Sequence, residues 1–271
     1  MSIPNVPLDR GIHVVHLFYR LNRAVWQGLP AAASAQAREQ LQALATEWAA
    51  ASNPRLTAYA TIGNKADLAF LLQHKTLDGV GAMRCAVETA FPPGALEPVY
   101  SYLSVTELTE YMPTEEEARE RLLHQEKLAA DSEEFNRRLA EEKRRLEDYS
   151  HYRLYPELPD WEVMAFYPMN KRRTGVDNWY MLDFATRRKL MGSHARTGRK
   201  YAGKVVQMIT GSTGLDDWEW GVTLVARQVD VIKQIVYEMR FDEVSARYAD
   251  FGPFYINLRL AVPDLWTFLR L

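Results

Sequence analysis

A pattern of strands and helices occurs twice along the chain, and this repeat restricts the fold more than any other feature. Apolar runs with the two-residue period of strands alternate with segments that have the spacing of amphipathic helices. In the first half we expect strands at 13–20, 56–62, 67–73 and 98–105 and helices at 35–51 and 76–90. In the second half we expect strands at 162–169, 204–210, 219–226 and 253–258 and helices at 183–200 and 228–239. Each half therefore has the order βαββαβ, although the two halves share little sequence identity.

This order predicts an α+β fold. A βαββαβ unit is the ferredoxin-like motif. Two such units in one chain form a tandem ferredoxin-like repeat, or dimeric α+β barrel, in which the strands join into an antiparallel sheet with the helices outside. We expect four parts: an N-terminal half at 1–112, a charged helical connector at 113–152, a C-terminal half at 153–260 and an apolar tail at 261–271.

The connector differs in composition from the two halves. Residues 114–148 contain 12 acidic and 8 basic side chains and few large apolar ones. Thr114 and Glu117 have the spacing of a capping box, and the pairs Glu117–Arg121 and Glu134–Arg138 have the i,i+4 spacing of helical ion pairs. The segment is therefore expected to be a solvated helix or a hairpin of helices. It is typical of a surface connector, and it could also cover a pocket or a subunit edge.

The C-terminal tail is too apolar to extend freely into water. Its large side chains are Leu265, Trp266, Phe268 and Leu269. Exposure of four such side chains in one short segment would be unfavourable. We expect the tail to dock on this chain or on a neighbouring copy.

The bulk composition is that of a cytoplasmic enzyme or binding protein. The net charge of −2 gives no overall attraction to nucleic acid or to an anionic membrane, so an anionic ligand would need a local cluster of cations. Cys85 is the single cysteine, which excludes an internal disulfide and a paired-cysteine metal site. The N-terminal segment lacks the pattern of a signal peptide, and no stretch reaches the roughly 18 apolar residues of a membrane-spanning helix.

Residues 167–179, YPMNKRRTGVDNW, combine several reactive and charged groups at the end of an apolar strand. With a period of two, Tyr167 should share a face with Ala165 and Met169. A tyrosine at such a place is usually a core residue, but here Lys171, Arg172 and Arg173 follow at once. Cations that point into a cleft would pair with carboxylates. The alternative, a solvated basic turn, is equally compatible with the sequence.

His194 lies in the helix that follows. It comes three residues after Met191 and four after Leu190, so it should face the sheet with them. By itself, this placement is more typical of a buried histidine with one hydrogen bond. The other histidines do not have the spacing of a protein metal site: they are His13, His16, His74, His124 and His151. A single histidine can still bind haem iron axially, because the porphyrin supplies four ligands.

A strand end with tyrosine and cations, opposite one histidine, would suit an iron porphyrin with several carboxylates. Such a haem would be held without a covalent bond, because the chain lacks the CxxCH attachment motif. Two further polar residues are candidates. Arg240 follows a predicted helix, and Gln207 alternates with the apolar Val205 and Ile209 on a predicted strand. A buried glutamine would need a partner, whereas at a sheet edge it would contact water.

Four motifs of the second half strongly resemble the coproheme decarboxylases, the haem-biosynthesis branch of the chlorite dismutase superfamily found in Gram-positive bacteria. The motifs are YPMNKRR at 167–173, NWY at 178–180, GRKYAGKVVQMITGSTGLDDWEWGVTL at 198–224 and YEMRFDEVSARYADFGPFY at 237–255. The resemblance is continuous from about Asp160 to Tyr255. It is weaker over 1–112, where YSYLSVTEL at 100–108 is the clearest part, and it is absent over 113–150.

The resemblance implies a role for each matching residue. His194 would be the axial iron ligand, Tyr167 a catalytic tyrosine that forms a radical, and Lys171 a catalytic residue beside the second reacting propionate. The remaining matches would bind or surround the substrate: Arg153 and Arg240 at propionates, with Met169, Trp179, Gln207 and Ser245 in the pocket. Gln207 stands where chlorite-decomposing members have a distal arginine, which favours decarboxylation over chlorite chemistry.

The implied reaction is the hydrogen-peroxide-dependent decarboxylation of two propionates of Fe-coproporphyrin III (coproheme), with haem b as product. Coproheme would be both substrate and redox cofactor. Two alternatives stay open: a general haem peroxidase or chlorite dismutase-like enzyme, and a haem carrier without catalysis. The resemblance also implies a homo-oligomer, a ring of five copies, and coproporphyrin ferrochelatase as the donor of coproheme.

Overall fold

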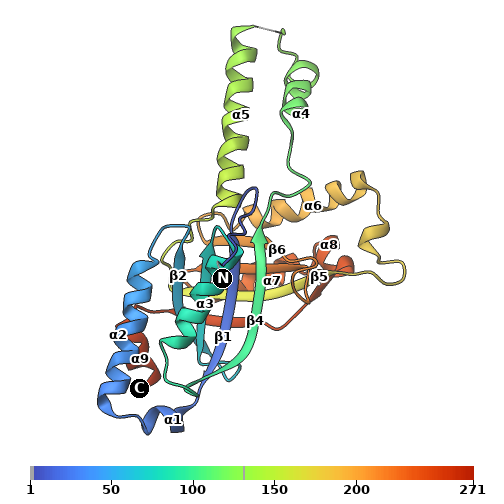
Figure 1. The fold of residues 1–271 in the computed structure, drawn as a ribbon. Coiled ribbons are helices and arrows are strands. Elements are labelled where there is room, and N and C mark those ends of the chain that lie inside the picture. The colour runs from blue at the N-terminus through green and yellow to red at the C-terminus, as the bar shows by residue number, and fades with distance from the viewer. Residues whose placement is uncertain (1–2, 131) are drawn as a thin grey trace.

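The computed structural model describes residues 3–130 and 132–271. Each half contains the strands and the two long helices that the sequence predicts, with bounds that differ by a few residues (Figure 1). In the N-terminal half these are β1 (His13–Leu21), α2 (Ala31–Glu47), β2 (Arg55–Ile62), β3 (Leu68–His74), α3 (Leu77–Thr89) and β4 (Leu96–Thr106). In the C-terminal half they are β5 (Val163–Lys171), α6 (Phe184–Arg199), β6 (Val205–Gly211), β7 (Trp220–Ala226), α7 (Val229–Met239) and β9 (Tyr255–Arg259). The predicted α+β fold is confirmed.

The strands of the two halves form one closed antiparallel sheet. Its order is β7-β6-β4-β1-β3-β2-β9-β5, and β5 also pairs with β7, which closes the ring. The halves are joined at two places. Thr106 of β4 pairs with Thr210 of β6, and Ala60 of β2 pairs with Leu258 of β9. The sheet is thus a barrel, with one face inward and the other covered by helices.

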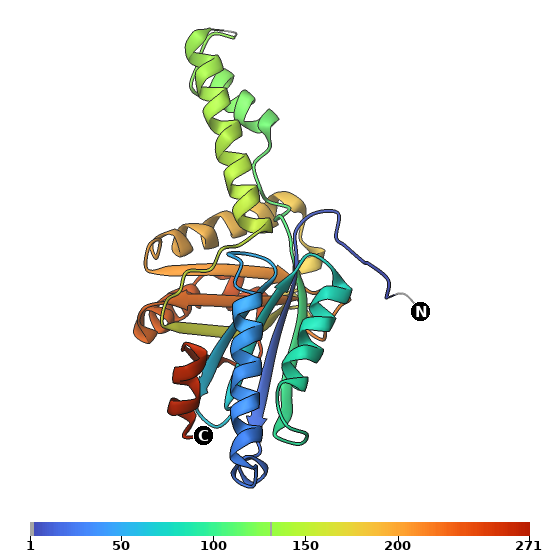
Figure 2. The ribbon, with the colours of Figure 1, turned by 60° about the vertical axis from the view of Figure 1, so that its left-hand side comes forward.

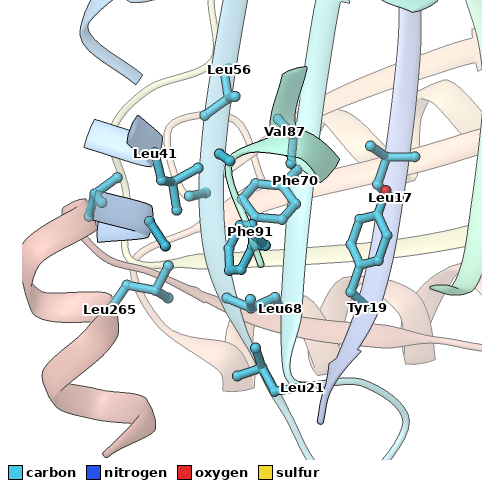
Figure 3. Close-up of a cluster of buried hydrophobic side chains, with 14 of the residues drawn as sticks. Leu17, Tyr19, Leu21, Leu41, Leu56, Leu68, Phe70, Val87, Phe91 and Leu265 are labelled. Atoms are coloured by element: carbon cyan, nitrogen blue, oxygen red, sulfur yellow. The ribbon is translucent and has the colours of Figure 1, made fainter. Parts of the chain in front are cut away.

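The barrel has an apolar interior and two separate outer clusters. Side chains from both halves fill the interior, among them Phe18, Tyr102 and Phe166. The outer face of the N-terminal half packs under α2, α3 and the C-terminal helix, as Figures 2 and 3 show. The outer face of the C-terminal half packs under α7, which contributes Ile232 and Ile235. None of the helices in the described ranges is long and apolar enough to cross a membrane.

The apolar tail docks on the N-terminal half of this chain. It forms α9 (Val262–Leu269), whose Leu265 is fully buried. Trp266 stacks on Trp26 with 5.3 Å between the ring centroids, and Arg23 donates a hydrogen bond to the carbonyl oxygen of Leu269 at 2.8 Å. Trp26 belongs to α1 (Arg23–Gln27), a short helix that the sequence patterns did not predict.

The charged connector forms a helical hairpin that projects from the barrel (Figures 1 and 2). It consists of α4 (Glu115–Glu120), the π-helical turn η1 (Arg121–Gln125) and the long helix α5 (Glu133–Leu154). The predicted capping box of Thr114 and Glu117 is present. The two predicted i,i+4 ion pairs were wrong. Glu117 instead contacts Arg188 of α6, and Glu134 contacts Arg137 at i,i+3 in its own helix, because Arg121 and Arg138 both turn to Glu126.

The docked tail leads to a stability prediction. Replacing Leu265 by alanine should lower the free energy of unfolding by about 2–5 kcal/mol, because it leaves a cavity in a fully buried site. Replacing Phe268, which is 48% exposed on the same helix, should change it by about 0.5 kcal/mol or less. Urea unfolding of both variants tests the docking, and equal effects would contradict it.

Candidate functional site

Strand β5 places three candidate residues on the outer face of the barrel. Ala165 and Tyr167 belong to the outer cluster of the C-terminal half, and Met169 packs against it, so the predicted shared face is confirmed. Tyr167 is 6% exposed and stacks on Phe254 with 4.3 Å between the ring centroids. Burial raises the pKa of Tyr167, and the positive charge of Arg240 opposes this effect. The phenol therefore keeps its proton at neutral pH.

Lys171 ends the same face of β5. It is 8% exposed, and its ammonium lies 4.5 Å from the centroid of the Trp179 ring. Burial lowers the pKa of Lys171 to about 8, while the charge of Glu219 opposes the shift. Within the described residues no carboxylate lies at ion-pair distance from this ammonium. A buried cation without an anion next to it is unfavourable, so the site is suited to an anionic group of a ligand.

His194 is held by a carboxylate from another helix. It lies on α6, which begins after the N-cap Asp183, and its Nδ1 is 3.0 Å from Oδ2 of Asp242. The second oxygen of Asp242 accepts a hydrogen bond from Thr197 at 2.9 Å. Because an ionised carboxylate only accepts hydrogen bonds, Nδ1 carries the proton and Nε2 keeps its lone pair. Burial and the positive charge of Lys171 lower the pKa of His194, which favours the neutral ring.

Gln207 lies beside the helix that carries His194. It is on β6, where Val205 belongs to the outer cluster and Ile209 packs against it, as predicted. Its Nε2 would be 3.4 Å from a Cβ added to Gly198, which is one turn after His194 on α6. The glycine thus leaves room for the amide between helix and strand. The structure therefore brings Gln207 close to α6 on the same side of the sheet.

Arg240 lies close to Tyr167. It follows the last residue of α7, and its guanidinium is 4.5 Å from the centroid of the Phe251 ring. Phe251 belongs to the short strand β8 (Ala249–Phe251), and its ring centroid is 5.8 Å from that of Tyr167. Arg240 and Tyr167 therefore share one aromatic neighbour, and the positive charge of Arg240 acts on the phenol.

Trp179 and Ser245 meet at a helix that the sequence patterns did not predict. This helix, α8 (Glu243–Tyr248), contributes the buried Ser245 and Tyr248. Trp179 lies in the short 3-10 turn η2 (Trp179–Met181), is 4% exposed, and has its ring centroid 5.5 Å from that of Tyr248. Helix α8 therefore connects the two candidates, and the preceding Asp242 connects them to His194.

Arg153 has a different environment from the other cations. It lies in the last turn of α5, and its guanidinium donates hydrogen bonds to the carbonyl oxygens of Glu107 at 3.3 Å and Ile209 at 3.4 Å. The neighbouring Tyr152 donates to the carbonyl oxygen of Gln207 at 3.2 Å. These bonds attach α5 to β6. The Nε of Arg153 is buried and has no hydrogen-bond partner among the residues that the structure describes.

The structure thus brings His194, Tyr167, Lys171, Gln207 and Arg240 to the outer side of the C-terminal half of the sheet. Helix α6 packs against α7 and α8. The width of the space between the imidazole of His194 and the phenol of Tyr167 stays a prediction.

Sequence reasoning missed two acidic residues of this site. Asp242 and Glu219 hold His194 and the end of β5, respectively. The only signal for Glu219 was an acidic residue at the start of an apolar strand.

The fold and the site together define a class: a closed barrel of two ferredoxin-like halves, with a carboxylate-bound histidine on an outer helix and a buried lysine whose charge acts on it. The chain belongs to the chlorite dismutase family, whose model matches residues 33–260.

Solved structures agree with this assignment. A novel haem-binding protein from Thermus thermophilus is 39% identical over 100% of this chain and 99% of its own, with a TM-score of 0.79. A double mutant of chlorite dismutase from Candidatus Nitrospira defluvii is 16% identical over 97% of each chain, with a TM-score of 0.71. The same enzyme in complex with imidazole is 15% identical over 97% of each chain, with a TM-score of 0.70. The last two matches show the fold alone.

The contact between the hairpin and the His194 helix should depend on pH. Arg188 of α6 donates to both oxygens of Glu117, and its hydrogen bonds are the main reason that the pKa of Glu117 falls to about 2. A carboxyl whose pKa is lower in the folded state stabilises the fold above its unfolded pKa, and this contribution is lost as the pH falls towards 2. At pH 7 the variant Glu117→Gln should therefore unfold at a slightly lower temperature than the natural protein.

The size of this effect should be small, about 1 kcal/mol or less, because the pair is near the surface. The difference between the two melting temperatures should shrink as the pH falls from about 4.5 to 2. Glu116→Gln, which removes the same charge at the neighbouring exposed position, is the matched control. A pH-independent difference for Glu117→Gln would contradict the assigned ion pair.

Proposed function

We propose that this protein is a haem-binding enzyme that converts coproheme to haem b with hydrogen peroxide as oxidant. The observation that carries the proposal is Lys171: a buried ammonium without a carboxylate partner in the described part of the chain, on the same strand face as the buried phenol of Tyr167. A carrier of haem would need neither group. Membership of the chlorite dismutase family supports the proposal, as does the likeness to a protein described as haem-binding.

The residues of the site fit an iron porphyrin with carboxylate arms. The hydrogen bond to Asp242 orients His194 and leaves Nε2 as a neutral donor for iron. Lys171, Arg240 and Arg153 would provide positive groups for carboxylates. Met169, Trp179 and Ser245 would surround the ring. The bound iron would supply the redox chemistry, and the protein would supply binding and orientation.

The proposed reaction balances without a further co-reactant. In each round a propionate loses carbon dioxide, one proton and two electrons, and a vinyl group forms. Hydrogen peroxide takes up these two electrons, the released proton and one proton from the solvent, and becomes two molecules of water. Tyr167 would first give up one electron and one proton, and its phenoxyl form would then take one electron and one proton from the propionate, so the resting phenol must be protonated. The raised pKa of Tyr167 meets this requirement.

The cations would act by holding the propionates in place. A hydrogen bond to a charged group contributes roughly 1.5–3 kcal/mol. Replacing Arg240 by glutamine should therefore weaken coproheme binding by about 10- to 100-fold without abolishing the reaction. Arg227→Gln is a matched control, because Arg227 is exposed and lies over Trp161, 5.1 Å from its centroid. Titration of the Soret band measures both affinities, and an unchanged affinity of Arg240→Gln would contradict its role.

The central experiment is mass spectrometry of the porphyrin before and after addition of peroxide. The natural protein should convert coproheme to a product that has lost two carbon dioxide molecules and four hydrogen atoms. Tyr167→Phe should bind coproheme with unchanged affinity and give no product. Tyr100→Phe is a matched control, since it removes a buried hydroxyl that has no partner among the described residues of the barrel interior. Normal conversion by Tyr167→Phe would exclude the radical role.

Two other functions give different results in the same assay. A haem carrier would leave coproheme unchanged after peroxide. A chlorite-decomposing enzyme would release oxygen from chlorite, and the neutral Gln207 argues against that activity. A cytoplasmic ring of five copies and a contact with ferrochelatase are further parts of the proposal, and both follow from the family resemblance alone.

A further inference from the structure

A buried carboxylate lies at the end of β5, next to the candidate site. Glu219, just before β7, is 3% exposed. Its Oε2 accepts a hydrogen bond from the backbone N–H of Lys171 at 2.7 Å. Its Oε1 accepts a hydrogen bond from the hydroxyl of Tyr180 at 2.7 Å and a further one from the guanidinium of Arg173. One carboxylate thus has three donors, and all three come from the same short segment.

That segment, residues 171–181, connects β5 to α6, and we call it the Trp179 loop. Glu219 binds the loop near its beginning, at Lys171 and Arg173, and near its end, at Tyr180. Between these points the loop folds back on itself, because the backbone N–H of Trp179 donates to the carbonyl oxygen of Arg172 at 2.9 Å. The indole of Trp179 then covers the Lys171 ammonium. Without Glu219 both ends of the loop would lose their common anchor.

The way in which Glu219 holds Lys171 leaves the ammonium free. The Glu219 carboxylate accepts a hydrogen bond from the backbone N–H of Lys171. An ion pair with the ammonium itself would instead occupy the group that binds a ligand carboxylate. The negative charge nearby still favours the charged form of the lysine and opposes the effect of burial. Glu219 therefore stabilises the cation without competing for it.

We propose that Glu219 is a positioning residue: it anchors the Trp179 loop so that the Lys171 ammonium faces a carboxylate of the substrate. The inference rests on the proposed function, because it assigns Lys171 to a propionate. It adds a residue that contacts neither the substrate nor the iron. If Glu219 had only a structural role, replacing it would weaken the binding of all ligands equally. A change in the preference between two ligands therefore separates the two interpretations.

The first measurement uses the protein without haem. Hydrogen exchange of the Trp179 loop should be about 10-fold faster in Glu219→Gln than in the natural protein, because the neutral amide is a weaker acceptor for Lys171 and Arg173. Tyr180→Phe, which removes one of the three donors, should show a smaller increase. Exchange in Glu219→Gln that equals the natural rate would overturn the anchoring role.

The second measurement compares two ligands. Coproheme has four propionates and haem b has two. In this proposal, Lys171 faces one of the two propionates that are present only in coproheme. Glu219→Gln should bind coproheme about 10-fold more weakly, with a change of about 2-fold or less for haem b. Equal weakening of both ligands, or of neither, would overturn the proposal. If Glu219→Gln does not fold, the double variant Arg173→Gln, Tyr180→Phe takes its place, and an unchanged ligand preference overturns the proposal in the same way.

The two measurements also separate this inference from the proposed function. Neither needs peroxide or turnover. If the natural protein prefers coproheme and Glu219→Gln loses the preference, but no decarboxylation occurs, the positioning role stands and the proposed reaction fails. If the natural protein decarboxylates and Glu219→Gln keeps both its loop protection and its preference, the reaction stands and the positioning role fails.

Discussion

Backbone hydrogen bonds hold β5 between β7 and β9 in the closed sheet, and the direction of every candidate side chain on β5 depends on this pairing. Strand β5 is paired with β7 on one side and with β9 and β8 on the other. Because side chains alternate between the two faces of a strand, a slip of one residue would turn Tyr167 and Lys171 into the barrel. The partners on both sides prevent such a slip. The alternation along β5 thus separates the barrel core, which includes Phe166, from the candidate site outside.

In the candidate site, burial disfavours the charged forms of Lys171 and His194, and the neighbouring carboxylates offset this effect only in part. Asp242 supports His194, whereas Lys171 has an aromatic face and a carboxylate that contacts its backbone. The interior of the barrel shows the opposite arrangement. There His16 stacks on Phe166 and bonds to Thr223, and burial lowers the pKa of His16 to about 3. This neutral histidine belongs to the core, and the difference shows why burial alone does not identify a functional residue.

The periodicity of apolar residues was sufficient to predict the repeated strands and the long helices, because each of them buries one face. It also predicted that Tyr167 shares a face with Met169, and that Gln207 lies in line with Val205 and Ile209. It could not reveal α8 or β8, which are too short to show a period. The hydrogen bonds from His194 to Asp242 and from Lys171 to Glu219 join residues 48 positions apart. Contacts over such separations depend on tertiary packing, and a single sequence carries no local signal for them. The site roles themselves stay predictions.

The docking of α9 links the last helix to the first half of the chain. The N-terminal cluster includes Leu41 and Phe70 together with Leu265 and Trp266, so this core contains side chains from both ends of the sequence. During synthesis, the first half emerges from the ribosome long before α9 does. Its outer face then lacks part of its cover, and the apolar surface that α9 covers beside α2 is open to water or to a chaperone. Native burial of that surface is completed only when α9 has left the exit tunnel.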